Sequence, residues 1–344
     1  MINVTLLREI FQELYTPMVE AAHGEQGTRA LRELMGFLQA FYKHVSPESR
    51  TSRNLALKHL GGVTLGPLAG SQECPSLEHM PRFSSDQIVV QLLENGRLLI
   101  SQTAVVDPVD ASQVCVVYTY ENRSEKFYAK AQVREVINPG VGYASIFAVP
   151  TFDDLGLALL DYRDKLARRT SCQILTRVWS GQRRIIFRAA PESTMRDSLI
   201  QFLKNCLRGE VRPEQPATAT RPVDIKVTWF MSARLALIEI KWLGKSRKST
   251  GKLTSYSEAR ARKGAKQLAD YLDGNADQAP KQETRGYLVI FDGRRARVKP
   301  RTRTISHSDG FKYEHAEIVF TPRYHETRHD FAAPIRMFME PICD

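Results

Sequence analysis

The chain has 344 residues, of which 42% are hydrophobic and 25% are charged, and this composition excludes wholesale disorder and a fibrous architecture. Two folded domains are expected, because single hydrophobic cores rarely grow beyond about 250 to 300 residues. The net charge of +11 favours a polyanionic partner but does not identify it.

Neither an export signal nor a membrane span is expected. Glu9 interrupts the first apolar run before it reaches the length of a signal peptide, and no later stretch approaches about 18 uncharged apolar residues. The five cysteines are scattered and lack the C-x-x-C spacing of zinc sites and redox motifs. We therefore expect a cytoplasmic protein with free thiols and no contact with a membrane.

Residues 1–190 have the pattern of an α+β module. Helical apolar spacing over 5–22 and 28–43 predicts a helical hairpin around Gly24 and Gly27, and the Ser, Pro and Gly content of 44–85 predicts an extended loop. Five strands are then predicted at 88–93, 98–106, 114–120, 127–137 and 144–149. A helix at 153–169 and strands at 173–179 and 184–188 complete the module.

Residues 191–344 are predicted to form an α/β domain with a central mixed sheet. A helix over 192–207 ends at Gly209, a residue that tolerates left-handed geometry after a helix. The elements that follow are strands at 223–230 and 235–242, a basic loop, a helix at 257–272 and a strand at 286–291. The order is αββαβ.

Three residues with chemically active side chains fall on two of these strands. Residues two apart on a strand share a face, so Glu239 and Lys241 point together while Ile238 and Ile240 point into a core. Asp224 lies 15 residues before Glu239, on the neighbouring strand, and a hairpin can place the two acids side by side. Two carboxylates and an amine are therefore expected to converge.

Such a group favours a divalent cation. Adjacent carboxylates repel one another unless a cation lies between them, and hard oxygen ligands suit Mg²⁺ or Mn²⁺. A bound ion would polarise a phosphoryl group and lower the pKa of a water molecule, and Lys241 is expected to position that water or to offset developing charge. The pattern indicates a divalent-metal site suited to chemistry on a phosphoryl group.

These residues resemble the Pro-Asp…(Asp/Glu)-x-Lys signature of the PD-(D/E)xK nuclease superfamily, with Val223 inserted between Pro222 and Asp224. Gln267 and Tyr271 resemble the Gln-x-x-x-Tyr element that follows the core hairpin in exonuclease-like and defence-associated branches. The resemblance covers about residues 190–295. It implies a restriction-endonuclease-like core with Mg²⁺ or Mn²⁺ as cofactor, and phosphodiester hydrolysis in nucleic acid, with DNA favoured over RNA.

The resemblance also implies further roles. Glu192 would be an auxiliary metal ligand, with Glu210 and Glu214 as competing candidates, and Gln267 and Tyr271 would support the substrate side of the site. Because the predicted helix places Lys263, Gln267 and Tyr271 on one stripe, we expect them to face a phosphate backbone. Members often act in prokaryotic defence against phage, so the N-terminal module would sense a trigger or bind a partner subunit.

The positive charge is concentrated around this site. Residues 241–304 contain 17 Lys and Arg against six Asp and Glu, an excess that equals the net charge of the whole chain. Flanking residues expected to contact substrate phosphates are Lys245, Arg247, Lys248, Lys252, Arg260 and Lys263, with Arg262 beside them.

Other interpretations remain open. Glu239 and Lys241 could form a solvated face of an ordinary sheet, or the domain could bind nucleic acid without cutting it. His325, Glu326 and His329 match the H-E-x-x-H motif of zinc metalloproteases, although prolines at 322 and 334 leave little room for the long helix that the motif needs. The glycine-rich segment 244–252 lacks the spacing and the Ser or Thr of a phosphate-binding loop, so ATP binding is not expected there.

Overall fold

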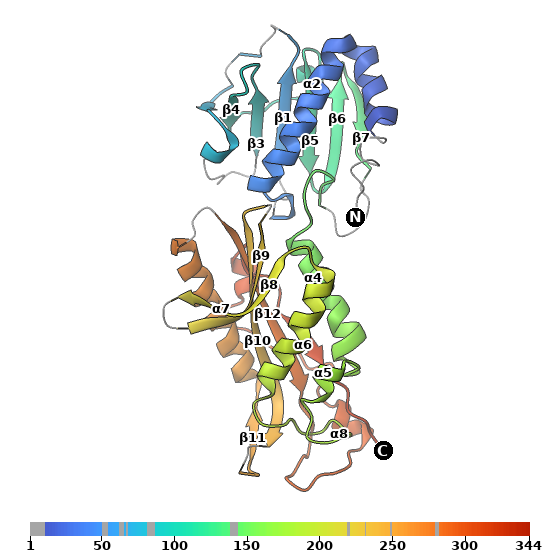
Figure 1. The fold of residues 1–344 in the computed structure, drawn as a ribbon, viewed down its shortest axis with the longest axis vertical. Coiled ribbons are helices and arrows are strands. Elements are labelled where there is room, and N and C mark those ends of the chain that lie inside the picture. The colour runs from blue at the N-terminus through green and yellow to red at the C-terminus, as the bar shows by residue number, and fades with distance from the viewer. Residues whose placement is uncertain are drawn as a thin grey trace. The chain divides into compact units, whose positions relative to one another are not determined.

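The computed structural model describes residues 11–49, 54–61, 65–66, 68–80, 87–137, 144–218, 221–230, 232–247, 250–278 and 282–344. The chain divides into two compact units, Met1–Pro150 and Thr151–Asp344 (Figure 1). We expected the division after residue 190, but residues 151–190 lie in the second unit, because Phe152, Leu159 and Phe187 are buried in its core. Both units have a mixed α/β architecture.

In the first unit, a long helix packs against the sheet. The π-helix η1 (Phe11–Tyr15) leads into α2 (Thr16–His44), which is interrupted at Gly24, where φ is 62° and ψ is −153°. The break expected around two glycines therefore occurs at Gly24, and Gly27 lies within the helix against Val19 and His23. Residues 5–10 of the expected first helix lie outside the described residues.

The sheet of the first unit has seven strands in the order β2-β4-β3-β1-β5-β6-β7. Its strands are β1 (Asn54–His59), β2 (Gln72–Cys74), β3 (Ile88–Leu92), β4 (Leu98–Ser101), β5 (Cys115–Glu121), β6 (Ser124–Ala129) and β7 (Gln132–Glu135). Short helical turns lie at η2 (Pro47–Ser49), η3 (Leu77–His79) and α3 (Pro108–Ala111).

Three predictions in this unit were wrong. The loop expected over 44–85 contains β1, the central strand, all of whose residues are buried, so that no alternation of polar and apolar residues marks it. The single strand expected at 127–137 is a hairpin, because Lys130 and Ala131 have positive φ values of 44° and 63° between β6 and β7. Residues 144–149 form turns, and Ser145 and Ile146 donate hydrogen bonds to the buried carboxylate of Glu125.

The second unit begins with α4 (Phe152–Tyr162), which continues as the π-helix η4 (Arg163–Ala167), and α5 (Gln173–Thr176). The strand expected at 173–179 was therefore wrong, and only an isolated bridge joins Trp179 to Phe187. Two further short helices are α8 (His307–Phe311) and α9 (Tyr324–Thr327).

The second sheet has the strand order β13-β12-β10-β9-β8, with β11 paired to β10. Its strands are β8 (Glu210–Thr218), β9 (Arg221–Trp229), β10 (Arg234–Arg247), β11 (Leu253–Tyr256), β12 (Glu283–Gly293) and β13 (Ile335–Phe338). Sequence periodicity did not predict β8, which carries Pro213 and Pro216 at the edge of the sheet, where a missing N–H is tolerated.

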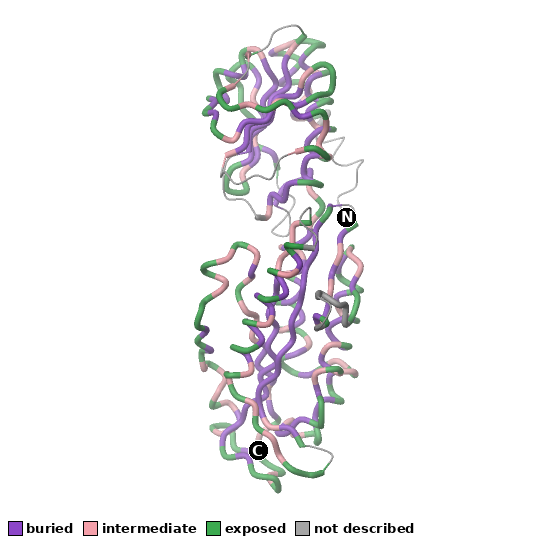
Figure 2. The backbone as a smooth tube through the Cα atoms, turned by 90° about the vertical axis from the view of Figure 1, so that its left-hand side faces the viewer, coloured by how far each residue is buried: buried purple, intermediate pink, exposed green. Residues whose placement is uncertain are grey.

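Helices cover both faces of this sheet (Figure 1). On one face, Ile238 and Ile240 of β10 pack with residues of α6 (Pro191–Cys206) such as Leu199. On the other, Leu237 packs with Leu268 of α7 (Glu258–Gln278). Figure 2 shows the strands as the buried centre of the unit, with exposed residues on the surrounding helices and loops. Sequence alone predicted α6, β9, β10, α7 and β12 in this order.

Candidate active site

The structure brings Asp224 and Glu239 to adjacent strands at the same level. The antiparallel ladder between β9 and β10 ends at the pair Ile225 and Ile238, and the two acids are the next residue on each strand. One oxygen of Asp224, Oδ2, accepts a 2.8 Å hydrogen bond from the backbone N–H of Ile240. The acid on β9 is therefore held by the main chain of β10.

Glu239 is almost completely enclosed, with 1% of its surface exposed. Its Oε1 accepts a hydrogen bond from the ammonium group of Lys241, two residues along the same strand. Its other oxygen, Oε2, is buried and has no hydrogen-bond partner among the described residues. A buried carboxylate oxygen without a partner costs free energy unless a proton or a cation satisfies it.

The pKa values of both acids are raised above their ordinary values. Burial, followed by the charge of Asp224, raises the pKa of Glu239 to about 8, although Lys241 acts in the opposite direction. Burial also raises the pKa of Asp224, the hydrogen bond from Ile240 opposes that rise, and Glu192 adds to it. Without a cation, the pair therefore keeps a proton near neutral pH.

The side chain of Lys241 passes over a glycine of α7. A Cβ atom placed on Gly264 would lie 2.5 Å from Cγ of Lys241 and 3.0 Å from its Cε, closer than such atoms approach. Because Gly264 has no side chain, the side chain of the buried Lys241 has room to extend to Glu239. Gly264 is thus part of the site, although the sequence motif does not indicate it.

Glu192 lies at the first turn of α6, near the two acids, but it is bound to another group. Its carboxylate accepts a hydrogen bond from Arg260 in the first turn of α7. The Arg260 guanidinium lies over the rings of Trp242, at 5.1 Å, and Tyr256, at 4.6 Å. The N-termini of α6 and α7 are therefore linked beside the acids, and both present the positive end of a helix dipole there.

Gln267 and Tyr271 brace the strand that carries Asp224. The Tyr271 hydroxyl donates a 3.0 Å hydrogen bond to the carbonyl of Pro222 and accepts one of 2.5 Å from the Gln267 amide. Tyr271 is only 3% exposed, so the expectation that this stripe faces a phosphate backbone was wrong for it. The reason is that successive turns of α7 rotate from the exposed Lys263 into the core at Tyr271.

Arg196 is a site residue that the motif did not reveal. It lies one turn after Glu192 on α6, and its Nη1 is 3.8 Å from Oδ1 of Asp224. The spacing of four residues after Glu192 is the signal that could have indicated it. Arg196 places a positive charge beside the acid pair and opposes the rise in the pKa of Asp224.

The predicted phosphate contacts divide into two groups. Lys245 donates to the carbonyl of Val298, and Arg247 donates a 2.8 Å hydrogen bond to that of Pro300, so both cations contact protein backbone. Lys252 and Lys263 are exposed, as expected of residues that contact a ligand. Arg262 is exposed and donates to the carbonyl of Val319. Lys248 lies outside the described residues.

The acid pair fits a magnesium ion better than a multi-ligand metal centre. Among the described residues, no group of three or more His, Cys, Asp or Glu lies close enough together to hold a metal. Mg²⁺ commonly uses only one or two carboxylates and keeps several water ligands. The unpartnered Oε2 of Glu239 and the adjacent carboxylate of Asp224 are hard oxygen donors of that kind.

The H-E-x-x-H match does not form a zinc-binding helix. The helix α9 has four residues, Tyr324–Thr327, and ends before His329. Glu326 accepts a 3.0 Å hydrogen bond from Arg323 instead of lying between two histidines on one helical face. The long helix required for a metalloprotease site is therefore absent from this described segment.

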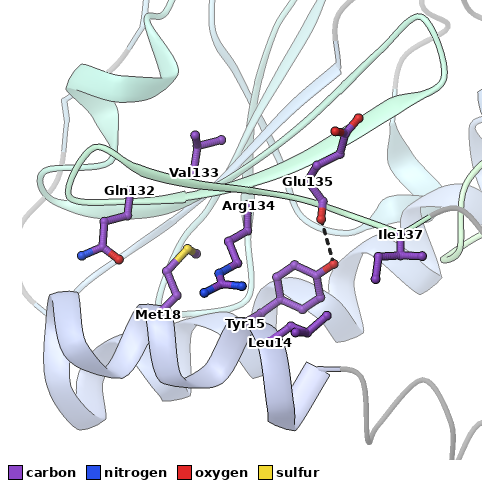
Figure 3. Close-up of a pocket in the computed structure, with 8 residues that line it drawn as sticks. All are labelled: Leu14, Tyr15, Met18, Gln132, Val133, Arg134, Glu135 and Ile137. Atoms are coloured by element: carbon purple, nitrogen blue, oxygen red, sulfur yellow. Dashed lines mark hydrogen bonds between the residues drawn. The ribbon is translucent and has the colours of Figure 1, made fainter.

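The first unit has a pocket of about 680 Å³ between the start of α2 and the edge strand β7 (Figure 3). The Tyr15 hydroxyl crosses it to donate a 3.1 Å hydrogen bond to the carbonyl of Glu135. The residues lining the pocket are Leu14, Tyr15, Met18, Gln132, Val133, Arg134, Glu135 and Ile137. Its walls do not combine a nucleophile with a general base.

In the first unit, Cys115, His59 and Gln91 are arranged like a catalytic triad with a cysteine nucleophile, but only their geometry is similar. Cys115 Sγ lies 3.4 Å from His59 Nδ1, and His59 Nε2 lies 2.9 Å from Gln91 Oε1. Cys115 is fully enclosed, and burial raises the pKa of its thiol to about 12. The thiol therefore stays protonated near neutral pH and is not a nucleophile.

Within the described part of the chain, no helix combines the length and the apolar character needed to cross a bilayer.

Comparison of the sequence with protein-family models and curated proteins, and of the fold with solved structures, produced no match.

Proposed function

We propose that the second unit is a metal-dependent nuclease with a restriction-endonuclease-like core, and that Asp224, Glu239 and Lys241 form its active site. The observation that carries the proposal is the buried Oε2 of Glu239, which has no partner among the described residues and lies beside a second acid and a lysine. The resemblance of these residues to the PD-(D/E)xK signature supports the same assignment.

A bound cation would offset the repulsion between the two acids. The buried carboxylate of Glu239 and the partly buried one of Asp224 repel one another across neighbouring strands, and this repulsion contributes to the raised pKa of Glu239. Asp224 and Glu239 would hold Mg²⁺ or Mn²⁺, which when bound supplies Lewis-acid polarisation of a phosphoryl oxygen and a more acidic water. The orientation of both acids is set beforehand, by the sheet and by the N–H of Ile240.

The chain's own groups suit phosphodiester hydrolysis. In that reaction, the oxygen of a water molecule bonds to phosphorus, one P–O ester bond breaks, and the departing oxygen gains a proton. The ammonium group of Lys241 can orient the water or offset charge on the phosphoryl oxygens, and the guanidinium of Arg196 adds a second positive charge beside Asp224. The helix N-termini of α6 and α7 favour binding of an anion there.

A direct test compares cutting by the wild type with that by Asp224→Asn, Glu239→Gln and Lys241→Met. The substrates are supercoiled DNA, linear DNA, single-stranded DNA and RNA, each with Mg²⁺, Mn²⁺ or EDTA. Matched controls are Asp270→Asn and Lys204→Met, which change exposed residues of α7 and α6. We expect metal-dependent cutting that the three site variants lose and the controls keep.

Two outcomes would contradict the proposal. Cutting that survives both Asp224→Asn and Glu239→Gln would place the chemistry elsewhere. Nucleic-acid binding that needs no metal, with no cutting of any substrate, would indicate a binding subunit instead of an enzyme.

A further inference from the structure

A loop after β12 displays a dense group of cations that the sequence motif does not include. Between Asp292 and Asp309 the sequence contains no acidic residue. Within this stretch, four basic residues have exposed side chains, and we refer to them as the basic loop: Arg297, Lys299, Arg301 and Arg303. Such a concentration of one sign of charge favours a polyanion.

The basic loop has a well-packed base. Val298 and Ile305 are buried with Ile185 and Ile186, which fixes the loop at both ends. In its centre, the N–H of Thr302 donates a 3.1 Å hydrogen bond to the carbonyl of Lys299. The backbone is therefore folded inward while the charged side chains project to solvent.

Two cations of β10 form hydrogen bonds with the backbone of this loop. Lys245 donates to the carbonyl of Val298, and Arg247 donates to that of Pro300 at 2.8 Å. These two residues, which we expected to contact substrate, instead hold the segment that displays the exposed cations. Their positive charges remain next to the loop and add to its positive electrostatic potential.

Three of the four exposed cations have no acidic partner among the described residues. Arg297 is 3.8 Å from Asp309 with 86% of its side chain exposed, and no ion pair of Lys299, Arg301 or Arg303 occurs within the described parts of the chain. By contrast, the surface residue Arg168 is paired with both Glu314 and Glu340. The basic loop is thus available to an external anion.

The distance from the acid pair to the loop sets the length of ligand that can reach both. Lys245, which contacts the loop, lies six residues beyond Glu239 on β10. At about 3.3 Å per residue, this corresponds to about 20 Å. The N-termini of α6 and α7, which the contact between Glu192 and Arg260 links, lie toward the end of the sheet where β11 pairs with β10 (Figure 1). A nucleic-acid strand that rises about 3.4 Å per nucleotide spans the gap in about six nucleotides.

We propose that the basic loop binds the phosphate backbone of a nucleic acid about six nucleotides away from the phosphodiester bond at the acid pair. This inference rests on the proposed nuclease function. It assigns substrate anchoring to a segment distinct from the catalytic residues. It also makes binding dependent on substrate length, because a short strand at the acids does not reach the loop.

The test measures binding separately from cutting. In a Glu239→Gln background with EDTA, a fluorescent 24-base-pair duplex and a 6-base-pair duplex are titrated at several salt concentrations by anisotropy. The loop variant is Lys299→Gln/Arg301→Gln/Arg303→Gln. The control variant, Arg177→Gln/Lys204→Gln/Arg208→Gln, removes three exposed cations from other parts of the same unit.

For the 24-base-pair duplex, we expect the loop variant to bind at least about tenfold more weakly, with a log–log salt slope reduced by about 2 to 3, and the control variant to bind as its parent does. For the 6-base-pair duplex, we expect no difference between parent and loop variant. Unchanged affinity and slope on the long duplex would overturn the proposal. Equal weakening on both duplexes would overturn the six-nucleotide separation.

Failure of the nuclease assignment is recognised independently. If the loop variant loses affinity for the long duplex but no nucleic acid is cut under any metal condition, the loop is a binding surface and the catalytic proposal fails. If cutting depends on Glu239 while the loop variant binds normally, the catalytic proposal stands and the loop inference fails.

Discussion

The Asp224 carboxylate of β9 accepts a 2.8 Å hydrogen bond from the backbone N–H of Ile240 on β10. Ile240 lies between Glu239 and Lys241, and its own side chain is buried on the opposite face of the sheet. One strand therefore supplies an acid, an amine and the main-chain group that holds the second acid. The spacing of the three functional groups follows from the sheet itself.

Divalent metal should stabilise the folded protein through the acid pair. A ligand at 100 times its dissociation constant adds about 2.7 kcal/mol to the free energy of unfolding. We expect Mg²⁺ or Mn²⁺ to raise the melting temperature of the wild type and to have little effect on Glu239→Gln, because that change removes the negative charge and replaces one carboxylate oxygen by an NH2 group, which does not bind the metal. Calorimetry with and without EDTA checks this, with Asp270→Asn as the control. Equal stabilisation of Glu239→Gln would show that the metal binds elsewhere.

Without metal, stability should fall as the pH rises from about 4.5 to about 8. The pKa of Glu239 is about 8 in the folded protein, mainly through burial, against an ordinary value of 4.5. Between these values the unfolded chain releases the proton that the folded protein keeps, so the stabilisation is complete below the lower value and is lost by the upper one. Each pKa unit corresponds to about 1.4 kcal/mol, so the total loss is a few kcal/mol.

Urea unfolding in EDTA at pH 5, 6.5 and 8 measures this dependence. Because an amide does not ionise, Glu239→Gln should lose less stability than the wild type over the same interval. The raised pKa of Asp224 also lowers stability as the pH rises, but Asp224 is present in both proteins. The difference between their two pH profiles therefore reports the contribution of Glu239. Parallel pH profiles for the two proteins would refute the raised pKa.

Replacing Gly264 by alanine should disturb Lys241. The added Cβ would lie 2.5 Å from Cγ of the lysine, so its side chain must move and its contact with Glu239 is lost. We expect cutting to fall at least about tenfold and stability to fall by about 1 to 3 kcal/mol, partly offset by the better helix propensity of alanine. The control is Gly156→Ala in α4, where no atom lies within 4 Å of the added Cβ. It should keep full activity and gain up to about 1 kcal/mol.

The hydroxyl of Tyr271 should affect activity more than its contribution to stability suggests. Tyr271→Phe removes the hydrogen bond to the carbonyl of Pro222, two residues before Asp224, and costs about 1 kcal/mol. We expect a several-fold fall in the rate of cutting because the acid is less well positioned. Tyr162→Phe is a matched control, since it removes a buried hydrogen bond of 2.7 Å to Ser198 in the same unit. Equal activity of the two variants would mean that Tyr271 is only structural.

The elements α6, β9, β10, α7 and β12 of the second unit were predictable because local spacing reflects local geometry. The helix expected at 192–207 is α6 (Pro191–Cys206), and the alternation around Glu239 and Lys241 correctly indicated that they share a face of β10. Where this local signal is weak, prediction failed. The fully buried β1 shows no alternation, and β8 contains two prolines.

The residue types of the candidate site came from the sequence by itself: two acids and a lysine at spacings that a hairpin brings together. The partner of each polar side chain was decided only by the tertiary structure. Glu192 pairs with Arg260, Lys245 donates a hydrogen bond to the carbonyl of Val298, and no described residue forms a hydrogen bond with Oε2 of Glu239. The physical reason is that backbone periodicity acts over a few residues, whereas hydrogen bonds and burial depend on segments far apart in the chain.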